Sequence, residues 1–159
     1  MRRKRQQLTP AECDAILHQA TSGVLALTGD AGYPYAIPLS YVYADGCIYF
    51  HSAVEGHKID AIRGDGRCSF CVVARDDVQP AAYTTHYRSV IAFGHISIIT
   101  DDAEKLRTLR LLGQRYAPGD DDGLQREIDG GIHRLVMLCL RIEHLTGKEA
   151  IELVKRPTP

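Results

Sequence analysis

Asparagine and tryptophan are absent from this chain of 159 residues, and no long apolar run stands out. Without asparagine the chain offers no acceptor for N-glycosylation. No apolar stretch approaches the roughly 20 residues that a membrane-spanning helix needs. No apolar run follows the basic segment at residues 1–7, as it would in a secretory signal. We therefore expect a soluble, cytoplasmic protein without a membrane partner.

The chain also has no excess of charge of either sign, because its 19 lysine and arginine residues are balanced by 20 aspartate and glutamate residues. Nucleic-acid-binding domains usually carry a basic surplus gathered on one face. The basic residues 2–5 do not continue into a longer stripe, so we interpret residues 1–8 as a flexible, solvated tail. We expect no nucleic-acid partner.

Cysteine occurs five times, an odd number at scattered positions. This pattern argues against a disulfide framework and favours a reducing compartment. Cys68 and Cys71 have CxxC spacing, but they fall within a predicted strand, where residues three apart point to opposite faces. We interpret both as core thiols. The seven histidines form no HExxH pattern, and we predict no metal site.

The pattern of apolar and turn residues predicts a mainly β fold with short helices, in a single domain over 1–159. Strands are predicted at 23–28, 35–43, 47–51, 68–74, 89–100 and 135–143, helices at 10–20, 57–63 and from the Asp101 cap to about Tyr116, and an acidic surface loop at 118–123. Long helices do not alternate with the strands, which excludes βαβ folds. We expect a six-stranded antiparallel barrel closed at its ends by helices.

The predicted strand at 35–43 has one bulky and one small face. Its bulky face comprises Tyr35, Ile37, Leu39, Tyr41 and Tyr43, and its small face comprises Ala36, Pro38, Ser40 and Val42. Proline cannot donate to a β-ladder. The small face around Pro38 therefore belongs either to an edge strand with a bulge or to a surface that admits a flat ligand.

A second candidate site follows the strand at 47–51. His51 and Ser52 end this strand, and a loop containing Gly56 leads to His57 and Lys58 at the start of a helix. A hydroxyl, an ammonium group and helix-start amides are groups that bind phosphate. No Walker or GxGxxG pattern accompanies them, and no GxSxG elbow indicates a hydrolase. An ordinary capped helix with an exposed lysine explains the same residues, and both interpretations remain open.

Four segments, in order within residues 23–149, resemble the nitroimidazole-resistance (Nim) branch of the pyridoxamine 5′-phosphate oxidase-like flavoproteins. They are residues 32–43, 48–53 with 56–58, 87–94 and 146–149. The resemblance implies a split β-barrel with flanking helices, assembled as a homodimer that binds FMN at the subunit interface.

The resemblance also implies roles for residues around the cofactor. Ser52 and Lys58 hold the FMN phosphate in the wider family pattern, with His57 beside them. His51 lies where Nim-type proteins carry a histidine near the flavin, which implies a catalytic acid/base that faces the substrate.

The remaining implied cofactor contacts come from other strands. Pro38, Leu39 and Ser40 would line the isoalloxazine ring. Ser89 would approach the ring or ribityl chain from a neighbouring strand. Lys148 would come from the partner subunit or from the barrel rim.

The activity implied is that of an FMN-dependent oxidoreductase, with NADH or NADPH as electron donor and a small acceptor such as a nitroaromatic compound. The double-basic phosphate clamp and the C-terminal arginine motif of pyridoxamine-phosphate oxidases are not evident. The resemblance therefore does not extend to oxidation of pyridoxamine phosphate. The alternative is a non-catalytic module of the same fold that stores or senses flavin, or binds haem.

Overall fold

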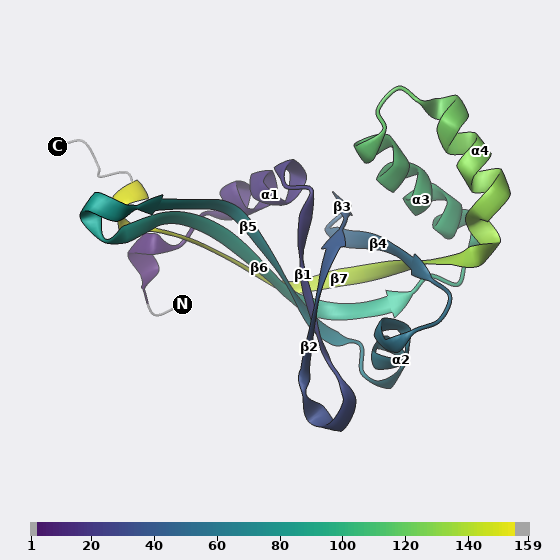
Figure 1. Cartoon of the computed structure of the whole chain (residues 1–159), viewed down its shortest axis with the longest axis horizontal. Helices are drawn as coiled ribbons and strands as arrows, with labels where there is room; N and C mark the ends of the chain where they lie inside the picture. Colours follow the sequence, from purple (N-terminus) through teal and green to yellow (C-terminus); the bar gives the residue numbers. More distant parts are fainter. Residues whose placement is uncertain (1–2, 155–159) are drawn as a thin grey trace.

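A computed structural model of the chain describes residues 3–154 (Figure 1). Within this range, seven antiparallel strands form one sheet in the order β2-β1-β5-β6-β7-β4-β3. The strands are β1 (Ser22–Thr28), β2 (Pro34–Ser40), β3 (Val42–Ala44), β4 (Cys47–Ala53), β5 (Arg67–Gln79), β6 (Thr84–Ile98) and β7 (Leu135–Glu149). The α-helices are α1 (Pro10–Gln19), α2 (His57–Gly64), α3 (Asp102–Tyr116) and α4 (Asp121–Gly131).

The two edges of the sheet are consecutive in the sequence. Only Tyr41 joins β2 to β3, yet these strands lie at opposite ends of the strand order. The sheet therefore curls until its edges approach each other without closing, which confirms the split barrel. One correction is needed, because the strand predicted at 35–43 is divided at Tyr41 and the barrel has seven strands instead of six. Tyr41 is fully buried and its hydroxyl donates to the carbonyl of Leu17 at 2.8 Å.

Aromatic and aliphatic side chains fill the inside of the barrel. The ring of Phe70 meets those of Tyr41 and Phe50 edge to face, with centroids 5.1 Å apart in both pairs. Leu17 of α1 and Ile59 of α2 are buried in the same core. Both helices therefore pack against the barrel core.

Two helices begin at the caps that the sequence predicts. The Thr9 hydroxyl accepts from the Glu12 amide at 3.3 Å, and the Glu12 carboxylate accepts from the Thr9 amide at 2.8 Å. Asp101 caps α3 by accepting from the Glu104 amide at 2.8 Å. Caps of this kind satisfy amides that have no partner in the first helical turn.

Beyond the barrel, β5, β6 and the end of β7 extend as an arm (Figure 1). The predicted strands at 68–74 and 135–143 are too short, and that at 89–100 starts too late. The residues of the arm are mostly polar, so apolar alternation does not reveal them. Pairing between strands stabilises them instead, helped by an ion pair of 2.6 Å between Arg88 on β6 and Glu149 on β7.

The N-terminal segment lies against the arm. Gln6 and Leu8 are buried; the Gln6 side chain donates to the Glu149 carbonyl, and the Leu8 amide donates to the Gly147 carbonyl, both at 3.0 Å. The expected flexible tail is therefore corrected for residues 6–8, which side-chain burial and backbone pairing hold in place. Residues 1 and 2 of that predicted tail lie outside the described range.

The acidic segment at 118–123, predicted as a loop, starts α4 in its second half. Asp120 caps this helix by accepting from the Gly123 amide at 2.9 Å. α4 packs closely on α3, where a Cβ at Gly113 would come within 2.3 Å of Leu124. The sequence does not predict this helix, because its glycines and clustered acidic residues are typical of turns. None of the helices between residues 3 and 154 is long and apolar enough to span a membrane.

Candidate functional site

The β2 strand has the two faces that its sequence predicts. Its side chains alternate between exposed and half-buried along the whole strand. Tyr35, Ile37 and Leu39 pack against the barrel core, whereas Pro38 and Ser40 are exposed on the opposite, outer face. Leu39 therefore offers only its backbone to a ligand on the outer face, while Pro38 and Ser40 offer their side chains too.

The outer face continues from β2 across the neighbouring strands. The register places Pro38 beside Val24 on β1 and Val24 beside Cys71 on β5. Cys71 in turn pairs with Ile91 on β6, and Ile91 with Thr146 on β7. Because paired residues share a face, these five side chains form one row across the sheet. All five cysteines of the chain are free thiols, Cys71 included.

Ser89 and Lys148 lie on this same outer face. Ser89 is two residues before Ile91 on β6, and it pairs directly with Lys148 on β7. However, β1 and β5 separate β6 from β2, so Ser89 is not on a strand adjacent to β2. The Lys148 ammonium lies 5.4 Å from the centre of the Tyr87 ring.

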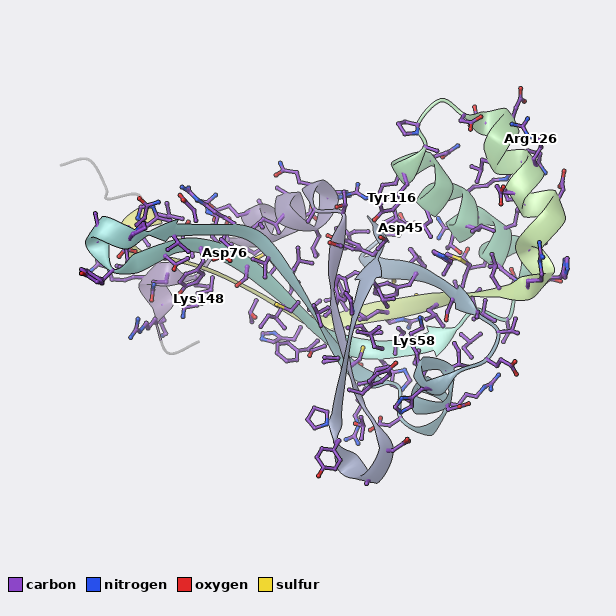
Figure 2. All side chains as sticks on the ribbon, viewed as in Figure 1. Asp45, Lys58, Asp76, Tyr116, Arg126 and Lys148 are labelled. Atoms are coloured by element: carbon purple, nitrogen blue, oxygen red, sulfur yellow. The ribbon has the colours of Figure 1, made fainter. Side chains whose placement is uncertain are left out.

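The residues predicted to bind phosphate lie elsewhere, where β4 leads into α2. Ser52 is buried near the end of β4, opposite Val136 on β7. Lys58 lies in the first turn of α2. Figure 2 shows Lys58 beside the barrel and Lys148 far out on the arm. A single chain therefore does not bring these two lysines together.

Lys58 carries a charge that its surroundings do not neutralise. Its side chain is half-buried, and burial lowers the pKa of its ammonium group. Among residues 3–154, no carboxylate forms an ion pair with it, and neither Lys58 nor the Ser52 hydroxyl makes a side-chain hydrogen bond. A buried charge without a counter-charge is unfavourable. The site is thus suited to an anionic ligand.

His57 is held in place at the start of α2. Its Nε2 atom lies 3.4 Å from a carboxylate oxygen of Asp30 in the β1–β2 connection. Its ring stacks on Tyr35 of β2, with centroids 4.3 Å apart and planes at 19°. These contacts attach the start of α2 to the β1–β2 hairpin. His57 directly precedes Lys58 in the sequence.

His51 is exposed on the outer face of β4 and lies opposite Met137 on β7. Together with Ser40 of β2 it borders a hollow of about 320 Å³ beneath α3. The structure therefore brings His51 and Ser40 to one place. The α3 side of the hollow consists of Leu109, Leu112, Gly113 and Tyr116.

Sequence reasoning does not identify these α3 residues as part of a site. Leu109, Leu112 and Tyr116 recur at helical spacing, which predicts a buried face of α3. This spacing does not predict which strands the buried face of α3 covers. In the structure, Leu112 packs with Val42 and Met137 in a second, smaller core over the outer face of β3, β4 and β7.

α3 is fixed at its C-terminal end by Tyr116 and Arg115. The Tyr116 hydroxyl accepts from the Tyr41 amide at 3.0 Å, lies 2.9 Å from the Tyr41 carbonyl and also contacts the carbonyl of Thr21. Arg115 donates to the carbonyl of Ala20 at 2.5 Å. The end of α3 is thereby attached to the junction between β2 and β3 and to the start of β1.

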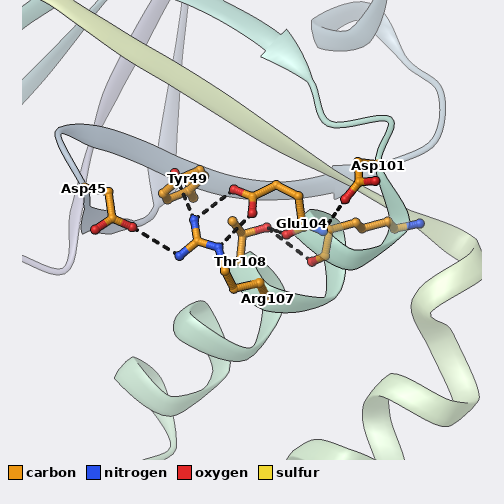
Figure 3. A network of polar contacts seen from close by, with 7 residues as sticks. Asp45, Tyr49, Asp101, Glu104, Arg107 and Thr108 are labelled. Carbon is orange, nitrogen blue, oxygen red and sulfur yellow. Dashed lines mark hydrogen bonds and ion pairs between the residues drawn. The ribbon is translucent and has the colours of Figure 1, made fainter.

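A polar network fixes the other end of α3 (Figure 3). The Arg107 guanidinium donates to Glu104 at 2.8 Å, to Asp45 in the β3–β4 turn at 3.1 Å and to the Tyr49 hydroxyl at 3.3 Å. These contacts join α3 to β4 and to the turn before it. The wall of the hollow is therefore attached to the sheet at both ends.

Comparison with known proteins identifies the family of this chain. A family model described as pyridoxamine 5′-phosphate oxidase matches residues 9–149. Comparison with curated proteins gives no match.

Three solved structures illustrate the similarity of fold. A candidate 5-nitroimidazole antibiotic resistance protein from Bacteroides thetaiotaomicron is 20% identical over 90% of this chain and 86% of its own, with a TM-score of 0.79. An FAD and haem binding protein from Mycobacterium smegmatis is 22% identical over 96% of this chain and 77% of its own, also at 0.79. An FAD-binding protein from Mesorhizobium loti is 25% identical over 91% of this chain and 97% of its own, at 0.63. Because the family model spans most of the sequence, the chain belongs to the pyridoxamine 5′-phosphate oxidase family.

Proposed function

We propose that this protein is a flavin-dependent oxidoreductase that binds FMN and reduces a small acceptor such as a nitroaromatic compound. The observation that carries the proposal is the half-buried, unpaired Lys58 in the first turn of α2, the helix that follows Ser52 and β4. The family and relatives of this barrel include flavin-binding proteins. The similarity to a candidate 5-nitroimidazole resistance protein supports the choice of acceptor.

The residues around the start of α2 fit a flavin phosphate. A phosphate beside Lys58 would supply the counter-charge that this ammonium lacks, and the Ser52 hydroxyl would donate to a phosphate oxygen. His57, held by Asp30 and Tyr35, adds a second nitrogen donor. The first amides of α2 favour an anion for the same electrostatic reason.

The outer face fits the flat part of a flavin. Pro38 and Ser40 are small and exposed, so β2 leaves room for a ring system to lie along it. When bound, the flavin supplies transfer of electrons from NADH or NADPH to the acceptor. His51, next to Ser40, would hold the proton that the acceptor takes up on reduction, a task suited to imidazole near neutral pH.

We also propose a homodimer with the flavin at the subunit boundary. Val24, Val73 and Phe93 expose 41%, 61% and 43% of their surfaces on the outer face. α3 covers that face only over β3, β4 and the start of β7. A second copy on the uncovered part would bury these apolar side chains and bring its own Ser89 and Lys148 toward the site.

A flavin- or haem-binding module without turnover is a second candidate. It is favoured by the fold shared with the FAD and haem binding protein from Mycobacterium smegmatis. In that case His51 and Ser40 border a cofactor and no acceptor reacts beside them.

The first experiment is an absorption spectrum of the purified protein after separate incubation with FMN, FAD or haem and removal of the excess. Retention of flavin bands with FMN supports the proposal, and a preference for FAD corrects the cofactor. A Soret band from haem alone favours the second candidate. A protein that retains no chromophore contradicts both.

Turnover is then tested with NADH or NADPH and 2-methyl-5-nitroimidazole. We expect His51→Ala to retain FMN but to reduce the acceptor about 100-fold or more slowly, because a general acid typically contributes about 10²–10⁴-fold. Equal rates for the wild type and the variant would remove His51 from the mechanism.

A further inference from the structure

A polar pocket of about 280 Å³ lies on the outer face of the sheet, where β6 and β7 pair. His95 and Ser97 of β6 line it together with Cys139, Arg141 and Glu143 of β7. None of these residues belongs to the groups proposed above for the flavin or its acceptor. The pocket therefore gathers a guanidinium, a carboxylate, an imidazole and a hydroxyl away from that site.

The pairing of the two strands brings these side chains to one side of the sheet. His95 lies opposite Arg141, and Ser97 lies opposite Cys139. Ile96, between the two β6 residues, is buried in the barrel core, so its neighbours point outward. The polar groups thus come from two adjacent strands, which position side chains more precisely than loops do.

A β-bulge in β7 places Glu143 at this pocket. The partners of Phe93 and of the residue after it are His144 and Ile142. Glu143, between these partners, is the extra residue of the bulge. The residue after Phe93 is Gly94, where a Cβ would come within 2.0 Å of a β7 carbonyl oxygen. Bulges of this kind redirect side chains and are frequent beside functional sites.

The two charges of the pocket are not neutralised by the rest of the described chain. Between residues 3 and 154, neither Arg141 nor Glu143 forms an ion pair or a side-chain hydrogen bond. The side chains of His95 and Ser97 likewise make no hydrogen bond within this range. All four side chains are therefore available to a ligand.

Opposite charges side by side favour a ligand that carries both. A guanidinium binds a carboxylate through two parallel hydrogen bonds, and a carboxylate accepts from an ammonium group. A simple anion would meet the like charge of Glu143, and a simple cation would meet that of Arg141. Residues two apart on a strand are about 7 Å apart. The two charges of the ligand must therefore lie close together, as they do in an α-amino acid.

We infer that this pocket binds a small zwitterion of the α-amino acid class. Arg141 holds the carboxylate of the ligand, with His95 and Ser97 as further donors. Glu143 accepts from its ammonium group. The inference does not rest on the proposed function, because the two sites share no residue.

The pocket lies at the border between the covered and the uncovered parts of the outer face. Cys139 packs in the core beneath α3. Phe93, two residues before His95, belongs to the face proposed to meet a second copy. A second copy that sets its own charges against Arg141 and Glu143 is thus the competing explanation for these unpaired groups.

Backbone amide signals in heteronuclear NMR spectra report binding of L-alanine, with acetate and ethylamine as probes that carry only one of its two charges. We expect L-alanine to shift the signals of the residues that line the pocket in a saturable manner. Each single-charge probe should bind at least about tenfold more weakly. Unshifted signals, or equal binding of L-alanine and acetate, would overturn the inference.

Two variants address the two halves of the pocket separately. Arg141→Met should weaken L-alanine at least about tenfold. Glu143→Gln should weaken L-alanine to a similar extent but bind acetate at least as well as the wild type, because the like charge is gone. Arg126→Met and Glu127→Gln, at exposed positions of α4 outside the pocket, are the matched controls. Equal binding of L-alanine by Arg141→Met and Arg126→Met would contradict the role of the guanidinium.

Light scattering on the same variants tests the competing explanation. We expect Arg141→Met and Glu143→Gln to keep the oligomeric state of the wild type. A changed oligomeric state in both, with no effect of L-alanine on the wild type, assigns the charges to contact between copies and overturns the ligand site. If Arg141→Met does not fold, the comparison of the three probes on the wild type decides.

Discussion

Lys58 is half-buried, and its ammonium group has no ion-pair partner within residues 3–154. Burial lowers its pKa, so the folded chain disfavours the ammonium form relative to the unfolded chain. This penalty is present below the folded pKa and disappears as the pH rises past the ordinary lysine value of about 10.4. A bound phosphate removes the penalty by supplying an anion, which couples ligand binding to stability.

Lys58→Met should therefore act in opposite directions on binding and on stability. Loss of a charge-assisted contact of about 1.5–3 kcal/mol weakens FMN roughly 10- to 100-fold. The unliganded variant should unfold at the same or higher temperature at neutral pH, because an unpaired charge is gone. Fluorescence titration and thermal unfolding measure the two effects. Lys105→Met on α3 serves as control, and FMN affinity equal in the two variants would contradict the phosphate role.

α3 is the element on which the hollow depends, because its two ends are attached to different strands. Arg107 attaches the start through Asp45 and Tyr49 (Figure 3), and Tyr116 attaches the end through the backbone of Tyr41. The acceptor of the Tyr41 amide is a side chain 75 residues away. Packing of Leu112 on the sheet then keeps the helix in place between the two attachments.

Tyr116→Phe should destabilise the protein by about 1–3 kcal/mol, because the partly buried Tyr41 amide loses its acceptor. Urea unfolding followed by circular dichroism measures the change. Tyr83→Phe is the control, since Tyr83 is 97% exposed at the tip of the arm and should leave stability unchanged. Similar midpoints for wild type and Tyr116→Phe would show that the attachment contributes nothing.

The whole molecule leaves a large part of its outer face uncovered, and the proposed dimer covers it. Phe93→Glu places a charge in the middle of that face, where a second copy would have to desolvate it. We expect this variant to be monomeric by light scattering and to lose FMN, because Lys148 of the second copy no longer reaches the site. Ala103→Glu, at an exposed position of α3, should remain dimeric. A dimeric Phe93→Glu protein would argue against this face as the interface.

Partly buried thiols make the stability of the whole fold sensitive to alkaline pH. Burial raises the pKa of Cys68 on β5 to about 12; burial, followed by the influence of Cys47, raises that of Cys139 on β7 to about 12. Below the ordinary thiol value of 9.0 both states keep their protons. Above it the unfolded chain releases protons that the folded chain retains, so stability falls as the pH rises from 9.0 toward 12.

This loss is measured by urea unfolding at a series of alkaline pH values. Cys68→Ala removes one of the contributing thiols and should show a shallower fall in the free energy of unfolding. Parallel curves for the variant and the wild type would contradict the contribution of Cys68.

Local features of the fold are readable from the sequence, and features that depend on distant partners are not. Thr9 and Asp101 cap their helices as predicted, and β2 alternates as predicted around Pro38. The division at Tyr41 is missed because it depends on a hydrogen bond to Leu17 and on burial in the barrel. The arm is missed because its polar strands are stabilised by pairing across strands, and not by an apolar pattern.

The sequence by itself determines the helix caps, the two-faced β2 strand and the placement of Ser52, His57 and Lys58 on either side of the short loop from β4 to α2, since these depend on residues a few positions apart. The candidate site is assembled by interactions that the sequence does not specify locally. Only the tertiary structure decides that Ser89 and Lys148 share a face with Pro38, and that α3 lies over His51. Strand order and helix docking join residues dozens of positions apart, and their energies come from surfaces that exist only after the sheet has curled around its core.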